Sequence, residues 1–147
     1  MAGASLQTIY YDDQEVIDAL KRLDSMVDDM TPVYRDIGEY LLPSTQDRFA
    51  DEEDPEGQPW EPLSDKYRRR KKKNTDKILV LDGYMRDLLA YQASSNQLKL
   101  GSNQIQAATH QFGDDSRNIS ERPFLGISTI DQQEILVILH QHLARYI

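Results

Sequence analysis

Three histidines and one acidic run are the residues of this chain whose types could support catalysis or metal binding. His140 and His142 are two residues apart in an expected helix, so they face different sides, whereas a helical pair of metal ligands needs a spacing of three or four. We therefore expect both on the helix surface. His110 stands beside Gln111 and Phe112, and no serine, cysteine or carboxylate partner is implied nearby. A half-buried histidine with a structural hydrogen bond is the favoured interpretation over a catalytic base.

The acidic run Asp51-Glu52-Glu53-Asp54 could attract a divalent cation through its carboxylates. It lacks the alternating ligands and the fixed glycine of a calcium-binding loop, so a solvated loop is the favoured interpretation. The next glycine, in Pro55-Glu56-Gly57, indicates a turn rather than a phosphate-binding loop. We expect no enzymatic activity, no cofactor and no bound metal. A hydrolase that uses this run together with His110 is the least favoured alternative.

A cationic run follows this acidic region. Residues 1–65 hold 17 acidic and 4 basic residues, residues 66–77 hold 8 basic and 1 acidic, and residues 78–147 hold 7 acidic and 5 basic. Two interpretations stay open: an exposed loop that acidic helices partly neutralise, or an arm that contacts an acidic surface of a protein or a nucleic acid. The net charge of -8 repels a phosphate backbone and speaks against a dedicated DNA-binding protein. The expected interaction residues are Trp60, Arg68, Arg69, Arg70, Lys71, Lys72 and Lys73.

Trp60, the only tryptophan, lies on a rigid stretch between Pro59 and Pro62. A large apolar group in this setting either covers a local core or anchors an interface. We favour the core and expect the ring to pack against the apolar faces of residues 33–49, because an exposed tryptophan on a loop would be a sticky surface group.

The length of 147 residues predicts one domain over 1–147, with residues 51–77 as an excursion made of the acidic loop and the basic arm. The absence of cysteine excludes disulfides and thiolate metal sites and fits a reducing compartment. Residues 1–5 lack the basic and apolar stretches of a secretory signal, and no apolar run approaches the roughly 20 residues that cross a membrane. We expect a cytoplasmic protein with no membrane partner.

The first half of the chain is predicted to be helical after one short strand. Residues 6–11 alternate between apolar and polar types, which is typical of a strand. Asp12 is expected to cap a first helix, whose apolar residues recur at spacings of three and four. A second helix is expected to begin with Thr31 as its cap. Pro43 is expected to kink or interrupt it before Phe49, which faces inward.

The second half is predicted to alternate short helices and strands. Ser64 is expected to cap a short helix that frays after Tyr67, and six adjacent like charges make residues 68–77 a mobile arm. A β-hairpin is expected around the turn Ser95-Asn96. The remaining elements are a helix over 104–112 with Ile105, Ala108 and Phe112 on its apolar side, a strand over 122–128, and a last helix capped by Ser128 with Asp131 or by Thr129 with Gln132.

These elements predict an α+β fold. A small antiparallel sheet is expected to pack against the N-terminal and C-terminal helices, and the basic arm is expected to leave the body of the protein.

Several segments follow one another in a characteristic order: Arg48-Phe49, 54–64, Tyr67 with 69–73, 78–88, 91–93, 98–103, Ala107-Ala108, 110–113 and 122–126. Taken together, these segments resemble the phage virion morphogenesis proteins, also known as the tail completion proteins of Mu-like and related tailed phages and prophages. The similarity covers most of the chain. After the His-Gln-Phe-Gly segment the family has a glycine-rich stretch, where this chain has the more acidic Asp114-Asp115-Ser116-Arg117.

The resemblance implies a structural protein of the virion that acts at the head–tail junction. Such proteins complete the tail or neck so that a filled capsid can join it. Related neck and tail completion proteins form rings, commonly hexameric, around the DNA path. The implied partners are further copies of the chain, the head–tail connector and tail proteins, with DNA passing through the ring without sequence-specific contacts. The protein would be made in the host cytoplasm and remain at the neck of the virion.

The segregated charges suggest how such a ring would close. We hypothesise that the acidic helices of one subunit contact the cationic arm of the next in a head-to-tail arrangement. The alternative function is a small nucleic-acid-binding module that uses Arg68 to Lys73. Steeply salt-dependent binding to duplex DNA would distinguish the alternative from a ring subunit.

Overall fold

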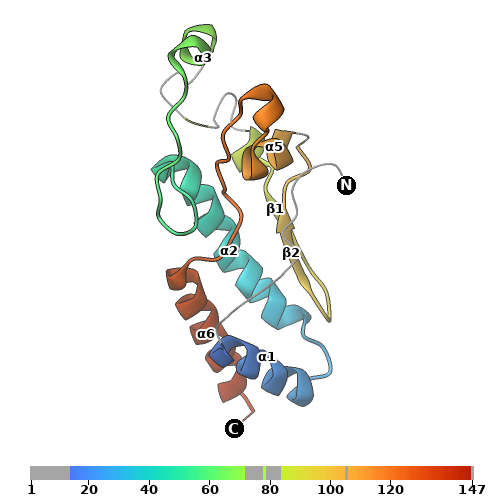
Figure 1. Cartoon of the computed structure of the whole chain (residues 1–147). Helices are drawn as coiled ribbons and strands as arrows, with labels where there is room; N and C mark the ends of the chain where they lie inside the picture. The colour runs from blue at the N-terminus through green and yellow to red at the C-terminus, as the bar shows by residue number, and fades with distance from the viewer. Residues whose placement is uncertain (1–13, 72–77, 79–83, 105, 147) are drawn as a thin grey trace.

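The molecule is an elongated α+β structure organised along one long helix (Figure 1). The computed structural model describes residues 14–71, 78, 84–104 and 106–146. The predicted class is confirmed, because a small antiparallel sheet packs against helices. In chain order the elements are α1 (Gln14–Met26), α2 (Thr31–Asp51), α3 (Asp65–Arg70), α4 (Tyr84–Asp87), β1 (Ala90–Ala93), β2 (Leu98–Gly101), α5 (Gln106–Phe112), the 3-10 helix η1 (Asp115–Arg117) and α6 (Thr129–Ala144).

Helices α1, α2 and α6 enclose the larger of two apolar clusters, here named the helical core. The predicted apolar side of α1 is confirmed for Val16 and Leu23, which are fully buried. Asp12 and the strand expected over 6–11 lie outside the described residues. No helix in the described part of the chain is long and apolar enough to cross a membrane. The members of the helical core are Val16, Ala19, Leu23, Met30, Val33, Ile37, Leu41, Ile135, Leu139 and Leu143.

The start of α2 differs from the prediction. Met30 occupies the N-cap position and makes no side-chain cap. Asp29 supplies the carboxylate instead: its Oδ1 accepts hydrogen bonds from the Thr31 N–H at 2.9 Å and from the Thr31 hydroxyl at 2.6 Å. The hydrophobic Met30 side chain is buried in the helical core, so packing rather than capping chemistry decides which residue stands at this position.

Pro43 lies inside α2 without ending it, so the expected interruption does not occur. A proline in a helix interior removes one hydrogen bond and costs about 3 kcal/mol. Pro43 itself is exposed, whereas Leu41, Thr45 and Phe49 are buried. Burial of a large apolar side chain contributes about 1.5–3 kcal/mol, so packing on the buried side outweighs the local cost and keeps residues 31–51 helical.

Helix α6 begins with the capping box that the sequence predicts. Ser128 Oγ accepts a hydrogen bond from the Asp131 N–H, and the Ser128 N–H donates to Asp131 Oδ2, both at 3.0 Å. The apolar residues expected to be buried on this helix are Ile135, Ile138, Leu139 and Leu143. Ile135, Leu139 and Leu143 lie in the helical core, and Ile138 is only partly buried against it. The local signal at Ser128 therefore sets where α6 starts, and the spacing of its apolar residues determines which side faces inward.

Asp131 also joins α6 to α2 through a buried polar network. Its carboxylate accepts hydrogen bonds from Arg48 Nη2 at 2.7 Å, the Tyr40 hydroxyl at 2.8 Å and Ser44 Oγ at 2.7 Å. Burial alone would raise the pKa of Asp131, but the bonds from Ser128, Ser44 and Tyr40 and the Arg48 charge hold it below its ordinary value. The network fixes the position of α6 along α2.

The β-hairpin has the predicted turn, Ser95-Asn96, and packs against α2. Its contact with the helix is close at Gly38, where an added Cβ would lie 2.5 Å from Cδ2 of Tyr91. The Tyr91 hydroxyl donates to Glu39 Oε1 at 2.5 Å. Glycine at position 38 therefore allows the Tyr91 ring of β1 to approach the helix closely.

The segment before α6 is not the strand that the sequence predicts. Gln111 of α5 takes the place of a neighbouring strand: its Oε1 accepts the N–H groups of Phe124 and Leu125, each at 3.0 Å. Its amide nitrogen donates to the Leu125 carbonyl at 3.2 Å, and the Arg122 N–H donates to the His110 carbonyl at 2.7 Å. A side chain and a helix end thus satisfy backbone groups that a sheet would otherwise pair.

Helix α5 presents to the core a side that matches the prediction only in part. Ala108 is partly buried and packs against the second apolar cluster, and Ile105 lies outside the described residues. Ala107 and Gln111 are the buried residues of α5, and Phe112 is 65% exposed. The expected position of Phe112 on the apolar side is wrong, because the hydrogen bonds of Gln111 to Phe124 and Leu125 determine how the helix is turned.

Candidate docking surface

Trp60 is buried at the edge of a second apolar cluster, here named the Trp60 cluster. Its ring meets that of Phe49 edge to face, with centroids 5.5 Å apart, and its Nε1–H donates to the Pro123 carbonyl at 2.8 Å. Only 4% of Trp60 is exposed, so the predicted burial against the second helix is confirmed. The indole therefore belongs to the core and holds the following loop in place. The members of the cluster are Phe49, Trp60, Ile78, Leu89, Ala107, Phe124 and Leu125.

Arg122 holds the chain between Trp60 and α3. Its Nε donates to the Glu61 carbonyl at 2.8 Å and its Nη2 to the Pro62 carbonyl at 3.2 Å. The residue is buried, which lowers its pKa, but a guanidinium remains charged at neutral pH. Two successive carbonyls are thus fixed to the segment that also binds the Trp60 indole. The loop that leads into α3 is anchored at both points.

Helix α3 is a regular helix from Asp65 to Arg70, whereas the sequence predicts a helix that frays after Tyr67. The predicted cap is confirmed, because Ser64 Oγ accepts a hydrogen bond from the Tyr67 N–H at 3.2 Å. The expected fraying after Tyr67 is wrong, since the helix continues to Arg70. Asp65 lies in its first turn and three arginines lie in its last turn, an arrangement that the helix dipole stabilises.

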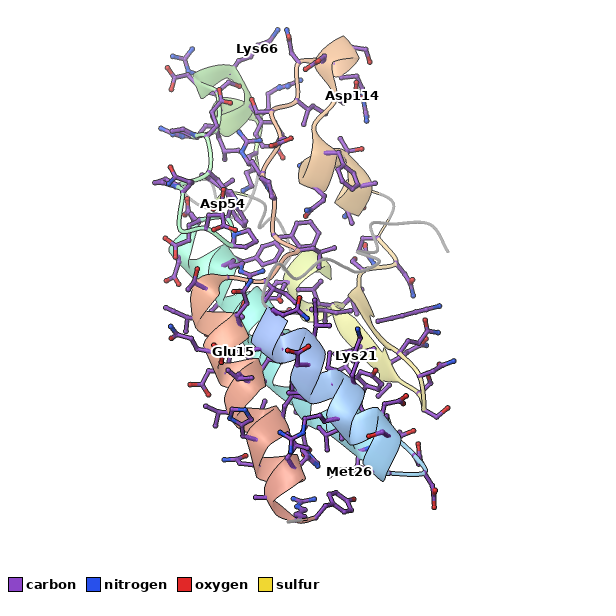
Figure 2. The ribbon with its side chains drawn as sticks, turned by 60° about the horizontal axis from the view of Figure 1, so that its bottom comes forward. Glu15, Lys21, Met26, Asp54, Lys66 and Asp114 are labelled. Carbon is purple, nitrogen blue, oxygen red and sulfur yellow. The ribbon has the colours of Figure 1, made fainter. Side chains whose placement is uncertain are left out.

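The cations of α3 form an exposed surface at one end of the molecule. Figure 2 shows Lys66 at that end and Met26 at the opposite end. Lys66, Arg68, Arg69 and Arg70 are all exposed, and no ion pair joins them to an acidic side chain among residues 14–71, 78, 84–104 and 106–146. The end of the protein therefore presents four positive charges to its surroundings.

Lys71 departs from the expected exposed arm. Its residue is 8% exposed, and its N–H donates to the Tyr67 carbonyl at 3.0 Å as the helix ends. Burial of this position removes it from the surface that a partner would meet first. Lys72 and Lys73, and the remainder of the expected arm to residue 77, lie outside the described residues.

Acidic side chains lie on the opposite side of the anchored loop, at the end of α2. The turn that follows α2 is ordered by Asp54, whose Oδ1 accepts the N–H groups of Glu56 and Gln58, both at 2.9 Å. No lysine or arginine occurs from Phe49 to Asp65. We name these side chains the acidic patch: Asp47, Asp51, Glu52, Glu53 and Glu56, which are exposed or half-buried.

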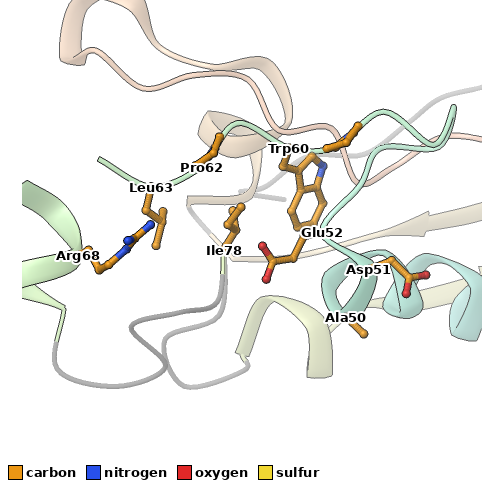
Figure 3. A pocket seen from close by; sticks show the side chains of 9 residues that line it. Ala50, Asp51, Glu52, Trp60, Pro62, Leu63, Arg68 and Ile78 are labelled. Carbon is orange, nitrogen blue, oxygen red and sulfur yellow. The ribbon is translucent and has the colours of Figure 1, made fainter. Parts of the chain in front are cut away.

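A pocket of about 380 Å³ separates the acidic patch from α3 (Figure 3). Asp51 and Glu52 lie on one side of it and Arg68 on the other, with Trp60 and Leu63 among the apolar lining. Interfaces between proteins combine an apolar centre with a polar rim, and an apolar lining flanked by charged side chains is compatible with that arrangement. The pocket therefore belongs to the same candidate surface as the acidic patch and α3.

The three histidines occupy three different environments. His140 is exposed, as expected, and points away from His142. His142 is 5% exposed and its Nε2 lies 2.6 Å from Asp36 Oδ2, so the expected surface position is wrong. It follows Ile135 by seven residues and Leu139 by three, and that spacing places it on the buried side of α6.

His110 is half-buried, as predicted, but its Nδ1 has no hydrogen-bond partner in the described structure. Burial and the charges of Arg122 and Arg117 lower its pKa. The expected structural bond from the ring nitrogen is therefore not made at Nδ1. The backbone of His110 has the structural role instead, because its carbonyl accepts the Arg122 N–H.

The acidic run does not converge into a metal site. Within the described ranges, no group of three or more histidine, cysteine or carboxylate side chains is arranged to hold a metal ion. Asp54 uses its carboxylate to cap the turn, and Glu52 ends α2 in the left-handed conformation at φ 56°. The run acts as a helix end and a turn.

Sequence reasoning did not identify Arg48, Gln111 or Arg122 as organising residues. Each bonds to backbone or carboxylate groups more than ten residues away. For Gln111 the available signal is weak, a polar residue on the inner side of a short helix. Arg48 and Asp131 are 83 residues apart, and nothing local links them.

Comparisons with known proteins give one match. The model of the phage virion morphogenesis family matches residues 11–144, which is nearly the whole chain. Searches of curated proteins and of solved structures found no significant match. The match includes every element that builds the candidate docking surface. The chain therefore belongs to the phage virion morphogenesis family, and its role lies in virion assembly.

Proposed function

We propose that this protein acts in tail completion and head–tail joining, as a ring subunit at the neck of the virion. The observation that carries the proposal is membership of the phage virion morphogenesis family over residues 11–144. A protein of this kind acts through its surfaces, and the surface described here is charged, anchored and located at one end of an elongated molecule.

The arrangement of charge supports a ring. A head-to-tail contact needs two different surfaces on each subunit, and rotation of such contacts closes a ring. The exposed cations of α3 and the carboxylates of the acidic patch are two surfaces of opposite sign on one chain. A closed ring with any number of subunits would use the same pair of surfaces.

The proposal is tested by deleting the gene from the phage or inducible prophage that carries it. We expect lysates with filled heads and free tails that do not join, counted by electron microscopy, and restored virions when the intact gene is supplied in trans. Normal virion yield after deletion would overturn the proposal. A loss of heads, with no free particles of either kind, would place the protein earlier in assembly.

A nucleic-acid-binding module remains the second candidate function because the four exposed cations of α3 have no acidic partner in the described structure. Binding to duplex DNA that weakens steeply between 50 and 200 mM salt, with unimpaired head–tail joining in the deletion strain, would favour this candidate. The neighbouring carboxylates of the acidic patch work against it, since they repel a phosphate backbone.

A further inference from the structure

We infer that α3 docks onto the acidic patch of a second copy of this chain, and that this pair of surfaces forms the contact between ring subunits. The inference rests on the proposed function, because it names the partner and the residues of the ring contact. Its partner is a carboxylate-rich protein surface, the end of α2 with Asp47, Asp51 and Glu56.

The first support is that α3 is a positioned element. Trp60 fixes the preceding loop to the Pro123 carbonyl, and Arg122 fixes the carbonyls of Glu61 and Pro62. No residue of α3 itself is buried. A helix whose residues are all exposed in the described part of the chain, yet which is held by an anchored loop, is already set for contact with another molecule. A fixed helix also loses little conformational freedom when it binds.

The second support is that the charges of α3 and of the acidic patch are not satisfied by ion pairs among the described residues. The pocket of about 380 Å³ lies between Arg68 and the carboxylates of Asp51 and Glu52. No ion pair bridges it in the structure as described. The described part of each chain therefore carries an exposed surface of each sign, and a neighbouring copy offers each surface its complement.

The third support concerns the choice between a protein and DNA. A DNA backbone that approached α3 would also approach the acidic patch across the pocket, where Asp51 and Glu52 repel phosphate. The net charge of -8 adds to this repulsion. A second copy meets no such conflict, because its acidic patch is the part that faces α3. Tyr67, 40% exposed among the cations, adds an amphipathic ring to the contact.

The test uses charge reversal in both surfaces of the full-length protein. Variant A carries Arg68→Glu, Arg69→Glu and Arg70→Glu; variant B carries Asp47→Lys, Asp51→Lys and Glu56→Lys. Self-association is measured by sedimentation at several protein concentrations. Exposed ion pairs are individually weak, so three reversals are used together, and we expect each variant alone to associate at least ten-fold more weakly than the wild type.

The two variants complement each other by design. In variant A both surfaces are negative, and in variant B both are positive, so an equimolar mixture should regain association as alternating A and B subunits. The matched control reverses three exposed cations elsewhere, Lys21→Glu, Arg22→Glu and Lys99→Glu, and should associate like the wild type. Circular dichroism of each variant confirms that the helices remain, and recovery in the mixture also shows that both variants are folded.

Several outcomes would overturn the inference. A wild-type protein that stays monomeric at all concentrations, variants that associate normally, or a mixture that stays apart would each do so. Loss of duplex DNA binding in variant A, with unchanged self-association, would assign α3 to nucleic acid instead. These results are separate from the fate of the proposed function, because head–tail joining in the deletion strain can require the protein even if α3 is not the ring contact.

Discussion

At the scale of single residues, Asp131 is a buried carboxylate whose charge its neighbours must compensate. It is 1% exposed, caps α6 through Ser128, and pairs with Arg48, which is itself buried and bonded to the carbonyls of Phe124 and Gly126. Removal of one member of a buried pair leaves the other charge uncompensated. The Arg48–Asp131 pair therefore connects the end of α2, the segment before α6 and the start of α6.

We expect Asp131→Ala to lower the free energy of unfolding by about 3–5 kcal/mol, the range for a broken buried ion pair. Urea titration followed by circular dichroism measures the change. Glu134→Ala, an exposed carboxylate on the same helix, serves as the control and should change stability by about 0.5 kcal/mol or less. A loss for Asp131→Ala no larger than that of the control would contradict the structural role of the pair.

The lowered pKa of Asp131 predicts how the stability of the protein depends on pH. The pKa of Asp131 is lower in the folded protein than in the unfolded chain, where it is about 3.9. The contribution of Asp131 to the free energy of unfolding is therefore complete at pH values above the unfolded pKa. It is lost as the pH falls through the lower pKa of the folded protein. The stability gap between the wild type and Asp131→Asn should narrow below about pH 4. Parallel stability curves for the two proteins from pH 7 to pH 2 would refute this.

Trp60 provides a second residue-scale prediction. We expect Trp60→Ala to destabilise the protein by about 3–5 kcal/mol, because the variant loses the contact with Phe49 and leaves a cavity in the Trp60 cluster. Trp60→Phe keeps an aromatic ring but loses the bond to the Pro123 carbonyl, so its loss should be smaller. Denaturant titration followed by circular dichroism gives both values. A change in stability near zero for Trp60→Ala would favour the alternative that Trp60 anchors an interface.

At the scale of elements, the loop before α3 depends on Arg122. We expect Arg122→Ala to increase hydrogen exchange at the backbone of residues 60–70, because the carbonyls of Glu61 and Pro62 lose their donors. Arg117→Ala, which removes an exposed ion pair with Asp114, is the control and should leave exchange in residues 60–70 unchanged. Equal protection of this segment in Arg122→Ala and the wild type would show that α3 is held by other contacts.

Local signals in the sequence predicted the elements that local chemistry determines. The hairpin turn Ser95-Asn96 and the capping box of Ser128 and Asp131 each involve neighbouring residues, and both are present. The strand expected over 122–128 is wrong because the side chain of Gln111, distant in sequence, takes its backbone donors. Propensity alone cannot show such a bond, since the segment has the composition of a strand in either case.

The candidate docking surface was predictable only in part, because some of its features depend on residues that are distant in the sequence. The cationic run and the acidic run are visible in the sequence, but their geometry is not. Charge repulsion predicts a frayed arm over 68–77, whereas Ser64 and the helix dipole keep 65–70 helical. The loop before α3 is anchored by Arg122, which is about 60 residues away from the carbonyls of Glu61 and Pro62 that it binds.

At the scale of the whole molecule, the helical core and the candidate docking surface lie toward different ends, whereas the Trp60 cluster lies beside that surface, because Trp60 and Ile78 line its pocket. The helical core gathers α1, α6 and the first part of α2 at one end, while α3 and the acidic patch lie at the other (Figure 1). We therefore expect stability to depend on buried residues such as Asp131 and Trp60, and we expect substitutions at the exposed charges of the candidate docking surface to leave both apolar clusters intact.

The central claim, a subunit of the neck, is tested most directly by electron cryomicroscopy of purified virions from the phage that carries the gene. The account predicts a ring of this chain at the head–tail junction, with α3 of each subunit against Asp47, Asp51 and Glu56 of the next. Absence of the chain from the junction, or a ring in which α3 contacts DNA or faces solvent, would contradict it.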